Sequence, residues 1–191
     1  RVGDRTIRAE HVVLATGAEA VIPNVRGLDE LGDLRWTSAD ALTAVARPRR
    51  LVILGGGVIG MELAQLFASF DTDVEMLDQL ATGFPDLSPE VGHLVDDALR
   101  GMGVAVRRST EVVSIRRESD EVVVELASGA SLNADRLLVA AGRRARTHGI
   151  GLESLGIDPH KPLPVDDRGR VACQGSVWAI GDVAGRGQYT H

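Results

Sequence analysis

The stretch that decides the fold is Leu51-Val52-Ile53-Leu54-Gly55-Gly56-Gly57-Val58-Ile59-Gly60-Met61-Glu62. Its first four residues form a continuous apolar run, which is typical of a strand covered on both faces of a parallel sheet. The glycines fit the pattern G-x-G-x-x-G, and residues 58–70 carry apolar side chains at helical spacing. This order of strand, glycine turn and helix predicts a Rossmann-type unit.

The second strand of this unit is predicted at Val74–Leu77, and Asp78 follows it at the spacing that a dinucleotide-binding fingerprint requires. Gly55 would permit the tight turn, Gly57 would let the backbone approach a pyrophosphate, and Gly60 would allow close helix–strand packing. The helix N-terminus would offer N–H groups to the phosphates, and Asp78 would accept hydrogen bonds from the adenosine ribose. The alternative is a structural glycine turn in a non-binding α/β protein, which the surrounding strand–helix–strand order disfavours.

The charge around Asp78 bears on the choice of dinucleotide. Residues 61–99 contain nine acidic side chains and no Lys or Arg. A 2′-phosphate at Asp78 would therefore be repelled, which favours NAD(H) over NADP(H). An alternative stays open, because a basic residue from the later hairpin, such as Arg107 or Arg108, would change this balance by reaching the site.

The remaining elements extend the same pattern. A short helix is expected to begin at Thr37 or Ser38, and a longer one at Ser88 and Pro89, which suit an N-cap and first turn. The apolar face of the longer helix is predicted to consist of Val91, Leu94, Val95, Leu99 and Met102. Further strands are predicted at 11–16, 103–106, 112–115, 122–126, 137–141 and 177–180. The fold class is therefore α/β, a doubly wound parallel sheet with a three-stranded antiparallel insertion at about 105–135.

Composition excludes several classes of function. The 191 residues include 21 Lys and Arg against 27 Asp and Glu, a net charge of −6, and only 3% are aromatic. Nucleic acid is therefore not expected as a partner, since phosphate contacts need clustered cations and base stacking needs aromatic rings. The single cysteine, Cys173, leaves no intramolecular disulfide and no cysteine cluster for zinc, and the five histidines show no ligand spacing, so no metal site is expected.

Membrane association is not expected either. The longest strongly apolar run, Leu51–Met61, is much shorter than the roughly 20 residues that span a bilayer. The chain opens with charged residues rather than a signal peptide, so a cytoplasmic location is predicted.

Four segments together resemble the pyridine nucleotide–disulfide oxidoreductase family, in particular its dihydrolipoamide dehydrogenase and mercuric reductase branch. The segments are Ala15-Thr16-Gly17-Ala18, residues 51–62, Ala141-Gly142-Arg143-Arg144 and Ala179-Ile180-Gly181-Asp182-Val183. The resemblance implies a flavoprotein in which a hydride passes between NAD(H) and FAD, with the NAD domain inserted into the FAD domain. It implies partial FAD-domain segments at 1–40 and 146–191 and an NAD-binding domain at 41–145.

The resemblance also implies roles for individual residues. Thr16, Gly17, Gly181 and Asp182 would lie by the FAD, with Asp182 at its ribityl and phosphate region; Thr190-His191 resembles a pair close to the flavin. On the NAD side the implied residues are Gly55, Gly56, Gly57, Val58, Ile59, Gly60, Glu62, Asp78, Val112 and Gly142. Of these, Glu62 matches a glutamate that pairs with a lysine near the flavin, Val58 and Gly142 border the nicotinamide, and Val112 lines the adenine side.

The chain also departs from the family pattern. It has no N-terminal FAD glycine fingerprint, no C-x-x-x-x-C pair and no C-terminal dimerisation domain, through which the parent protein is expected to form a homodimer. Arg144-Ala145-Arg146-Thr147 replaces the usual x-Pro-Asn, and Cys173 is expected to be a packed thiol because exchange chemistry needs a partner thiol. We therefore expect this chain to bind NAD(H), not to retain FAD, and to be inactive alone. A stand-alone NAD(H)-binding module, or a flavoprotein of the NADH oxidase or ferredoxin reductase type, is the alternative.

Overall fold

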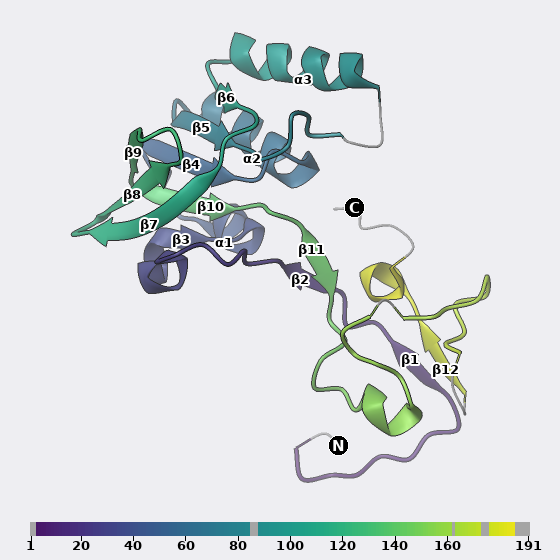
Figure 1. Ribbon diagram of the computed structural model, residues 1–191. Coiled ribbons are helices and arrows are strands. Elements are labelled where there is room, and N and C mark those ends of the chain that lie inside the picture. The colour runs from purple at the N-terminus through teal and green to yellow at the C-terminus, as the bar shows by residue number, and fades with distance from the viewer. Residues whose placement is uncertain (1–2, 85–87, 162, 173–175, 186–191) are drawn as a thin grey trace. The chain divides into compact units, whose positions relative to one another are not determined.

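The computed structural model describes residues 3–84, 88–161, 163–172 and 176–185. The chain forms two compact units (Figure 1). Unit 2 is the continuous segment 20–142, and unit 1 combines residues 1–19 with residues 143–191. Unit 2 is thus inserted into the sequence of unit 1. The assignment of cofactor-binding segments at 1–40, 41–145 and 146–191 stays a prediction, and residues 20–40 lie in unit 2.

A five-stranded parallel sheet forms the centre of unit 2. Its strands follow the spatial order β3-β10-β4-β5-β6, and every neighbouring pair is parallel. The bounds are β3 Arg35–Trp36, β4 Arg50–Leu54, β5 Asp73–Leu77, β6 Ala105–Arg107 and β10 Arg136–Val139. In β4, Val52 and Leu54 belong to one hydrophobic core. Leu51 and Ile53 belong to a second core, so the strand is buried on both faces, as its continuous apolar run predicted.

Two of the helices of unit 2 begin where the sequence predicted. Helix α1 (Ser38–Thr43) is capped by Thr37, whose N–H and hydroxyl both donate to Asp40 Oδ2 at 2.7 Å. These bonds, the backbone one first, lower the pKa of the Asp40 carboxyl. Helix α2 (Val58–Ser69) follows Gly57 directly and buries one face against β5 and β4. Its buried residues are Gly60, Met61, Leu63, Ala64 and Phe67.

Helix α3 (Pro89–Gly101) begins after Ser88 as predicted, but its buried face differs from the predicted one. The residues that it buries are Gly92, Asp96 and Leu99. Among the predicted apolar residues, Leu94 is 71% exposed. A Cβ on Gly92 would lie 2.2 Å from the Thr82 hydroxyl, so α3 approaches that loop through its glycine. Asp96 faces inward because Arg108 pairs with it there.

The antiparallel insertion is a three-stranded sheet in the order β7-β8-β9. Its strands are β7 Val112–Glu118, β8 Glu121–Leu126 and β9 Ser131–Ala134. The predicted hairpin turns at Ser119, which has a φ of 55°. The sequence did not locate β9, because only its last residue, Ala134, is fully buried and the apolar alternation is therefore weak. The predicted strand at 103–106 corresponds to β6 and belongs to the parallel sheet.

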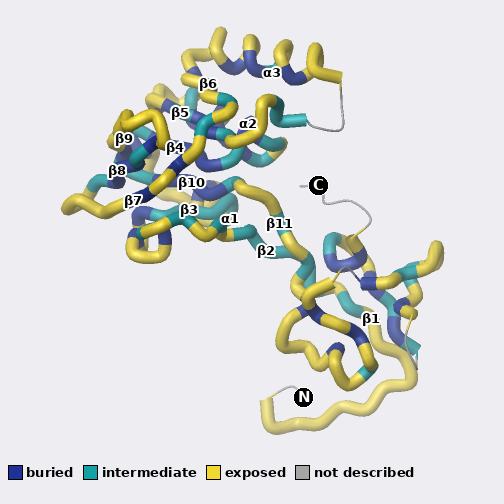
Figure 2. The backbone as a smooth tube through the Cα atoms, in the orientation of Figure 1, coloured by how far each residue is buried: buried dark blue, intermediate teal, exposed yellow. Residues whose placement is uncertain are grey.

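The two cores of unit 2 lie on opposite faces of the parallel sheet. One is filled by α2, together with parts of α1 and α3. The other is covered by the antiparallel sheet and by the 3-10 segment η1 (Leu28–Leu34), which contributes Leu28, Leu31 and Leu34. Figure 2 shows this burial along the backbone.

Unit 1 has a smaller core. Strands β1 (Val12–Leu14) and β12 (Val177–Ala179) pair in parallel, near the strands predicted at 11–16 and 177–180. A second pair joins β2 (Ala18–Ala20) and β11 (Arg143–Ala145), and two short 3-10 segments follow, η2 (Leu152–Leu155) and η3 (Gly181–Ala184). The buried residues are Leu152, Ile157, Leu163, Val171, Val177, Ala179, Val183 and Ala184. Cys173 and Thr190-His191 lie outside the described residues.

Candidate nucleotide-binding site

Two glycines of the turn after β4 are required by the fold itself. Gly55 has a φ of 111°, a conformation that other residues rarely adopt, and a Cβ there would lie 2.3 Å from the Ala140 carbonyl oxygen. A Cβ on Gly60 would lie 2.0 Å from the Gly55 carbonyl oxygen. Gly55 therefore permits the turn beside β10, and Gly60 lets α2 pack against the turn, as the sequence predicted.

Gly57 is different, because the fold does not need a glycine there. Its φ is −80°, and a Cβ would meet no atom within 4 Å. Gly57 is the N-cap of α2, and its first turn contains no acidic residue. Among the described residues, no side chain caps the helix. The first N–H groups of an α-helix lack partners within the helix and attract anions. Open space in front of these N–H groups fits the pyrophosphate of a dinucleotide.

Asp78 lies beside this turn, at the end of β5. Its Oδ2 accepts a hydrogen bond from the Gly56 N–H at 2.9 Å, and its Oδ1 accepts one from the Leu80 N–H at 2.9 Å. Its carbonyl oxygen accepts from the Thr110 N–H at 2.8 Å. The structure thus joins the glycine turn, the end of β5 and the chain after β6 through one aspartate.

Arg108 reaches Asp78, which is the alternative that the sequence left open. Its Nη1 lies 2.9 Å from Asp78 Oδ2 and also donates to the Gly56 carbonyl oxygen at 2.9 Å. Its Nε and Nη2 donate to the two oxygens of Asp96, at 3.1 and 2.7 Å. Arg107 instead pairs with Glu75 at 2.7 Å, away from Asp78.

Sequence reasoning did not identify Asp96 as part of this site. Its side chain is 4% exposed, against 12% for Asp78 and 10% for Arg108, so the three form a largely buried cluster. The available signal was an aspartate that falls between Val95 and Leu99 on a helix, where an unpaired charge would be costly.

The other residues predicted on the NAD side take different positions. Val58, in the first turn of α2, is 53% exposed, and Glu62 is exposed one turn later. Ile59 packs partly into the core beside the sheet. Gly142, shortly after β10, has a φ of 117°. Val112 is buried in a core, only 6% exposed, so its side chain does not face open space.

The residues predicted on the FAD side gather in unit 1. Leu14 pairs with Ala179, so Thr16-Gly17 and Gly181-Asp182 leave the carboxyl ends of two paired parallel strands. The Thr16 hydroxyl donates to the Arg146 carbonyl oxygen at 2.6 Å. Asp182 Oδ2 lies 3.3 Å from Arg143 Nη2, which also donates to the Ala18 carbonyl oxygen.

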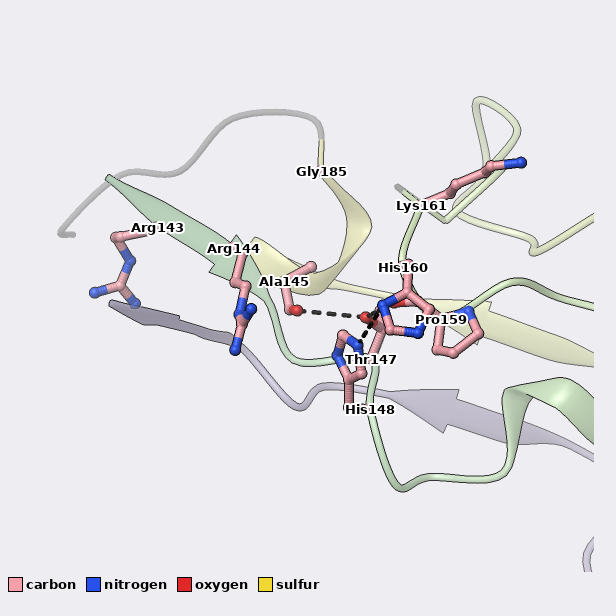
Figure 3. Close-up of a pocket in the computed structure, with 9 residues that line it drawn as sticks. All are labelled: Arg143, Arg144, Ala145, Thr147, His148, Pro159, His160, Lys161 and Gly185. Atoms are coloured by element: carbon pink, nitrogen blue, oxygen red, sulfur yellow. Dashed lines mark hydrogen bonds between the residues drawn. The ribbon is translucent and has the colours of Figure 1, made fainter. Parts of the chain in front are cut away.

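A separate cavity of about 350 Å³ lies within unit 1 (Figure 3). His148 Nε2 and His160 Nδ1 lie 3.1 Å apart in it, and the Thr147 hydroxyl donates to the Pro159 carbonyl oxygen at 2.6 Å. In Figure 3 the two imidazoles lie next to each other, with their ring planes at 75°, while the side chain of Lys161 points away from them. None of the residues predicted to bind a cofactor lines this cavity.

The described residues show neither a metal cluster nor a membrane-spanning helix. Within residues 3–84, 88–161, 163–172 and 176–185, no group of three or more His, Cys, Asp and Glu residues is placed to hold a metal ion. In the same residues, no helix has both the length and the apolar composition needed to cross a bilayer.

The family model described as pyridine nucleotide-disulphide oxidoreductase matches residues 1–191, the whole chain. The chain belongs to this family. Its members are FAD-dependent oxidoreductases that use NAD(P). Membership confirms the resemblance that the four sequence segments indicated.

Curated relatives of this oxidoreductase family include dihydrolipoyl dehydrogenase 3 of Pseudomonas aeruginosa, 34% identical over 99% of the chain and 41% of its own length. A mercuric reductase of Streptomyces lividans is 32% identical over 95% of the chain and 38% of its own length. The chain therefore spans about two fifths of the curated relatives that it matches.

Solved structures of the family share the fold. The HOCl-induced flavoprotein disulfide reductase RclA of Escherichia coli superposes with a TM-score of 0.84 at 30% identity, over 99% of this chain and 43% of that one. A water-forming NADH oxidase of Lactobacillus brevis, with NADH bound, superposes with a TM-score of 0.76 at 21% identity, over 92% of this chain and 39% of that one. At that identity the likeness concerns the fold alone.

The loop that departs from the family's usual sequence is well connected within unit 1. Arg144 pairs with Glu19 at 2.8 Å, and the Arg146 N–H donates to the Gly17 carbonyl oxygen at 2.9 Å. The Thr147 hydroxyl is buried and donates to the Pro159 carbonyl oxygen. The replacement of x-Pro-Asn therefore brings its own set of anchoring contacts.

Proposed function

We propose that unit 2 binds NAD(H) at the carboxyl ends of β4, β5 and β10, as the nicotinamide-nucleotide part of an FAD-dependent pyridine nucleotide–disulphide oxidoreductase. Gly57 carries this proposal. Packing and backbone conformation account for Gly55 and Gly60, but they leave Gly57 without a structural reason to be glycine. A ligand that lies directly against the backbone at the start of α2 supplies that reason.

The pyrophosphate would be held by the backbone at the start of α2. The N–H groups of Val58, Ile59 and Gly60 belong to the first turn, and no side chain in the part of the chain that the structure describes caps them. The partial positive charge of these N–H groups attracts a bound diphosphate, and Gly57 leaves room for the diphosphate to approach the backbone.

Asp78 would bind the adenosine ribose. A carboxylate has about four acceptor positions. Three are taken on Asp78 by the Gly56 N–H, the Leu80 N–H and Arg108. The remaining one, on Oδ1, is the acceptor that we assign to a ribose hydroxyl.

Bound NADH supplies a hydride from its nicotinamide ring, and the chain binds and orients that ring rather than reacting with it. We assign the nicotinamide end of the site to the exposed Val58 and Glu62 and to the backbone at Gly142. The adenine end is assigned to the segment near Val112, because Thr110, two residues earlier, bonds the Asp78 carbonyl.

We assign Thr16, Gly17, Gly181 and Asp182 to FAD contacts in the full-length parent protein. The described part of unit 1 does not form a complete FAD site, because its helical segments there are the four-residue η2 and η3, with no strand–glycine turn–helix for a pyrophosphate. This chain alone is therefore expected to bind NAD(H) without turnover. We also propose that the parent protein works in the cytoplasm and forms a homodimer. A size measurement of the full-length protein tests the homodimer.

The electron acceptor of the parent protein decides between its two candidate classes. A C-x-x-x-x-C pair in the parent sequence supports disulfide chemistry, and its absence supports a flavoprotein of the NADH oxidase type.

Calorimetric titration of the chain with NADH tests the proposed function. The wild-type chain is expected to bind one NADH per chain, and Gly57→Val to lose binding by at least about 100-fold, because the side chain fills the space for the pyrophosphate. Gly101→Val is the matched control: its Cβ also meets no atom within 4 Å, and it lies at the far end of α3. Saturable binding that is equal in wild type and Gly57→Val would place NADH elsewhere.

A further inference from the structure

Asp78, Arg108 and Asp96 form a buried cluster beside the glycine turn. Arg108 follows β6, Asp96 lies on α3, and Asp78 follows β5, so three separate elements bring one guanidinium between two carboxylates. No part of the assigned ribose contact requires Asp96.

The geometry shows that Arg108 has almost no donor capacity left. Its hydrogen bonds to the described residues use Nε once, Nη2 once and Nη1 twice, which leaves one N–H on Nη2. Gly83 lies close to this nitrogen, since a Cβ added there would lie 2.8 Å from Nη2. Arg108 therefore has at most one N–H to offer to a further anion while Asp96 holds it.

The same geometry fixes Asp78. The Nη1 group bridges Asp78 Oδ2 and the Gly56 carbonyl oxygen, so the carboxylate is tied to the glycine turn from two sides, by Arg108 and by the Gly56 N–H. The other carboxylate oxygen, Oδ1, keeps its open acceptor position. A guanidinium suits this task because its planar fork bonds both carboxylates in one orientation.

The charge balance excludes a 2′-phosphate. One guanidinium and two carboxylates leave the cluster with a net charge of −1, at the position where a 2′-phosphate would lie. A bidentate bond from Arg108 to that phosphate would require the loss of its bidentate bond to Asp96.

We propose that Arg108, held by Asp96, is a positioning residue that orients Asp78 toward a ribose hydroxyl and withholds its own charge from a 2′-phosphate, which makes the site selective for NAD(H) over NADP(H). This inference rests on the proposed function, since it concerns the ribose end of the same site. It assigns the selectivity to the Asp96 contact as well as to the acidic side chain at the end of β5.

The test compares NADH and NADPH binding to the full chain by titration, in wild type, Asp96→Asn and Asp97→Asn. Asp96→Asn keeps an acceptor for Arg108 but removes one negative charge, so the ratio of NADPH to NADH affinity should rise about tenfold. Asp97 is the neighbouring residue on α3, exposed and paired only with Arg100 among the described contacts, so Asp97→Asn removes the same charge at the surface and should leave the ratio unchanged.

The salt dependence of binding gives a second readout that needs no variant. In wild type, raising the salt from about 0.05 to about 0.5 M should bring the NADPH affinity closer to the NADH affinity, because screening weakens the repulsion. An affinity ratio in Asp96→Asn equal to wild type, or a wild-type ratio that does not move with salt, overturns the inference while the proposed function stands. A wild-type chain that binds neither dinucleotide overturns both.

Discussion

Units 1 and 2 present the same local arrangement, adjacent parallel strands whose carboxyl ends lead into glycines and an aspartate, but only unit 2 completes it. In unit 2 the end of β4 leads into Gly55-Gly56-Gly57, a twelve-residue helix and then Asp78 after β5. In unit 1 the ends of β1 and β12 lead into Thr16-Gly17 and Gly181-Asp182, and η3 is four residues long.

The difference teaches that a nucleotide site depends on how its parts are connected in sequence. The pyrophosphate and ribose parts of the unit 2 site come from nearly continuous chain between residues 50 and 108, so they are close in sequence before they fold. The paired strands of unit 1 come from near residue 13 and near residue 178, so they meet only after unit 2 has been traversed. Unit 2 is therefore expected to fold and to bind NAD(H) without help from unit 1. Unit 1 is expected to depend on contacts with other parts of the parent protein.

The largest expected contrast is in cofactor retention. The purified chain should carry no stoichiometric flavin, because unit 1 lacks a complete pyrophosphate site in its described residues, yet it should bind NADH through unit 2. The measurement is visible absorbance of the purified protein, with release and quantification of any flavin after heating. A yellow chain with one flavin per molecule would show that unit 1 does form an FAD site.

The next effect concerns the tightest packing in unit 2. Gly60→Val should prevent stable folding of unit 2, because even the Cβ would lie 2.0 Å from a backbone oxygen. Gly101→Val, the same change at an open position, should keep a thermal midpoint near that of wild type. Thermal unfolding followed by circular dichroism measures both; equal midpoints for the two variants would contradict the close approach of α2 to the turn.

A matched pair of core substitutions tests the independence of the units. Leu138 in unit 2 is 0% exposed and Leu152 in unit 1 is 1% exposed, so each Leu→Ala change should cost its own unit about 2–5 kcal/mol. Hydrogen exchange should speed up in β4 and β5 for Leu138→Ala, and in β1 and β12 for Leu152→Ala. Faster exchange in both units from either variant would mean that they unfold as one.

The smallest effect concerns acid stability. The pKa of Asp40 is lowered by hydrogen bonds from the Thr37 N–H and hydroxyl, and that of Asp166 in unit 1 by the N–H groups of Arg170 and Arg168. Because both folded-state pKa values are depressed, the stabilisation is present above the unfolded value of about 3.9 and is lost as pH falls through the folded one.

Asp40→Asn should therefore make the thermal midpoint of unit 2 fall less steeply as the pH is lowered. Asp166→Asn should do the same for unit 1. The Asp40 change should also cost about 0.5–1 kcal/mol near neutral pH, the usual contribution of a helix cap. Thermal midpoints between pH 3 and 6 measure the slopes; an unchanged acid limb in Asp40→Asn would assign the acid sensitivity to other groups.

The sequence predicted the parts of this fold whose periodicity is strong. Leu51–Leu54 is apolar without interruption because β4 is buried on both faces, and Ser88-Pro89 predicted where α3 begins. Strand β9 and the short β2, β3 and β11 escaped prediction because strands of two to four residues, mostly half-buried or exposed, leave little periodic signal.

The candidate site was predicted only in its continuous part. Gly55 to Gly60 and Asp78 follow a fixed spacing along the chain, so a pattern finds them. The Asp96–Arg108 contact joins a helix to the end of another strand, and its cause is a tertiary pairing that allows a buried charge on α3. The sequence left Arg108 as a candidate, but it gave no sign that Asp96, on an amphipathic helix, would be its partner.

The most direct test of the central claim is a residue-resolved NMR titration of the chain with NADH. We predict shift changes at the amides of Gly56, Gly57, Val58 and Ile59 and near Asp78, while the amides of Thr16, Gly17, Gly181 and Asp182 stay in place. Shift changes confined to unit 1, or none at saturating NADH, would contradict the account.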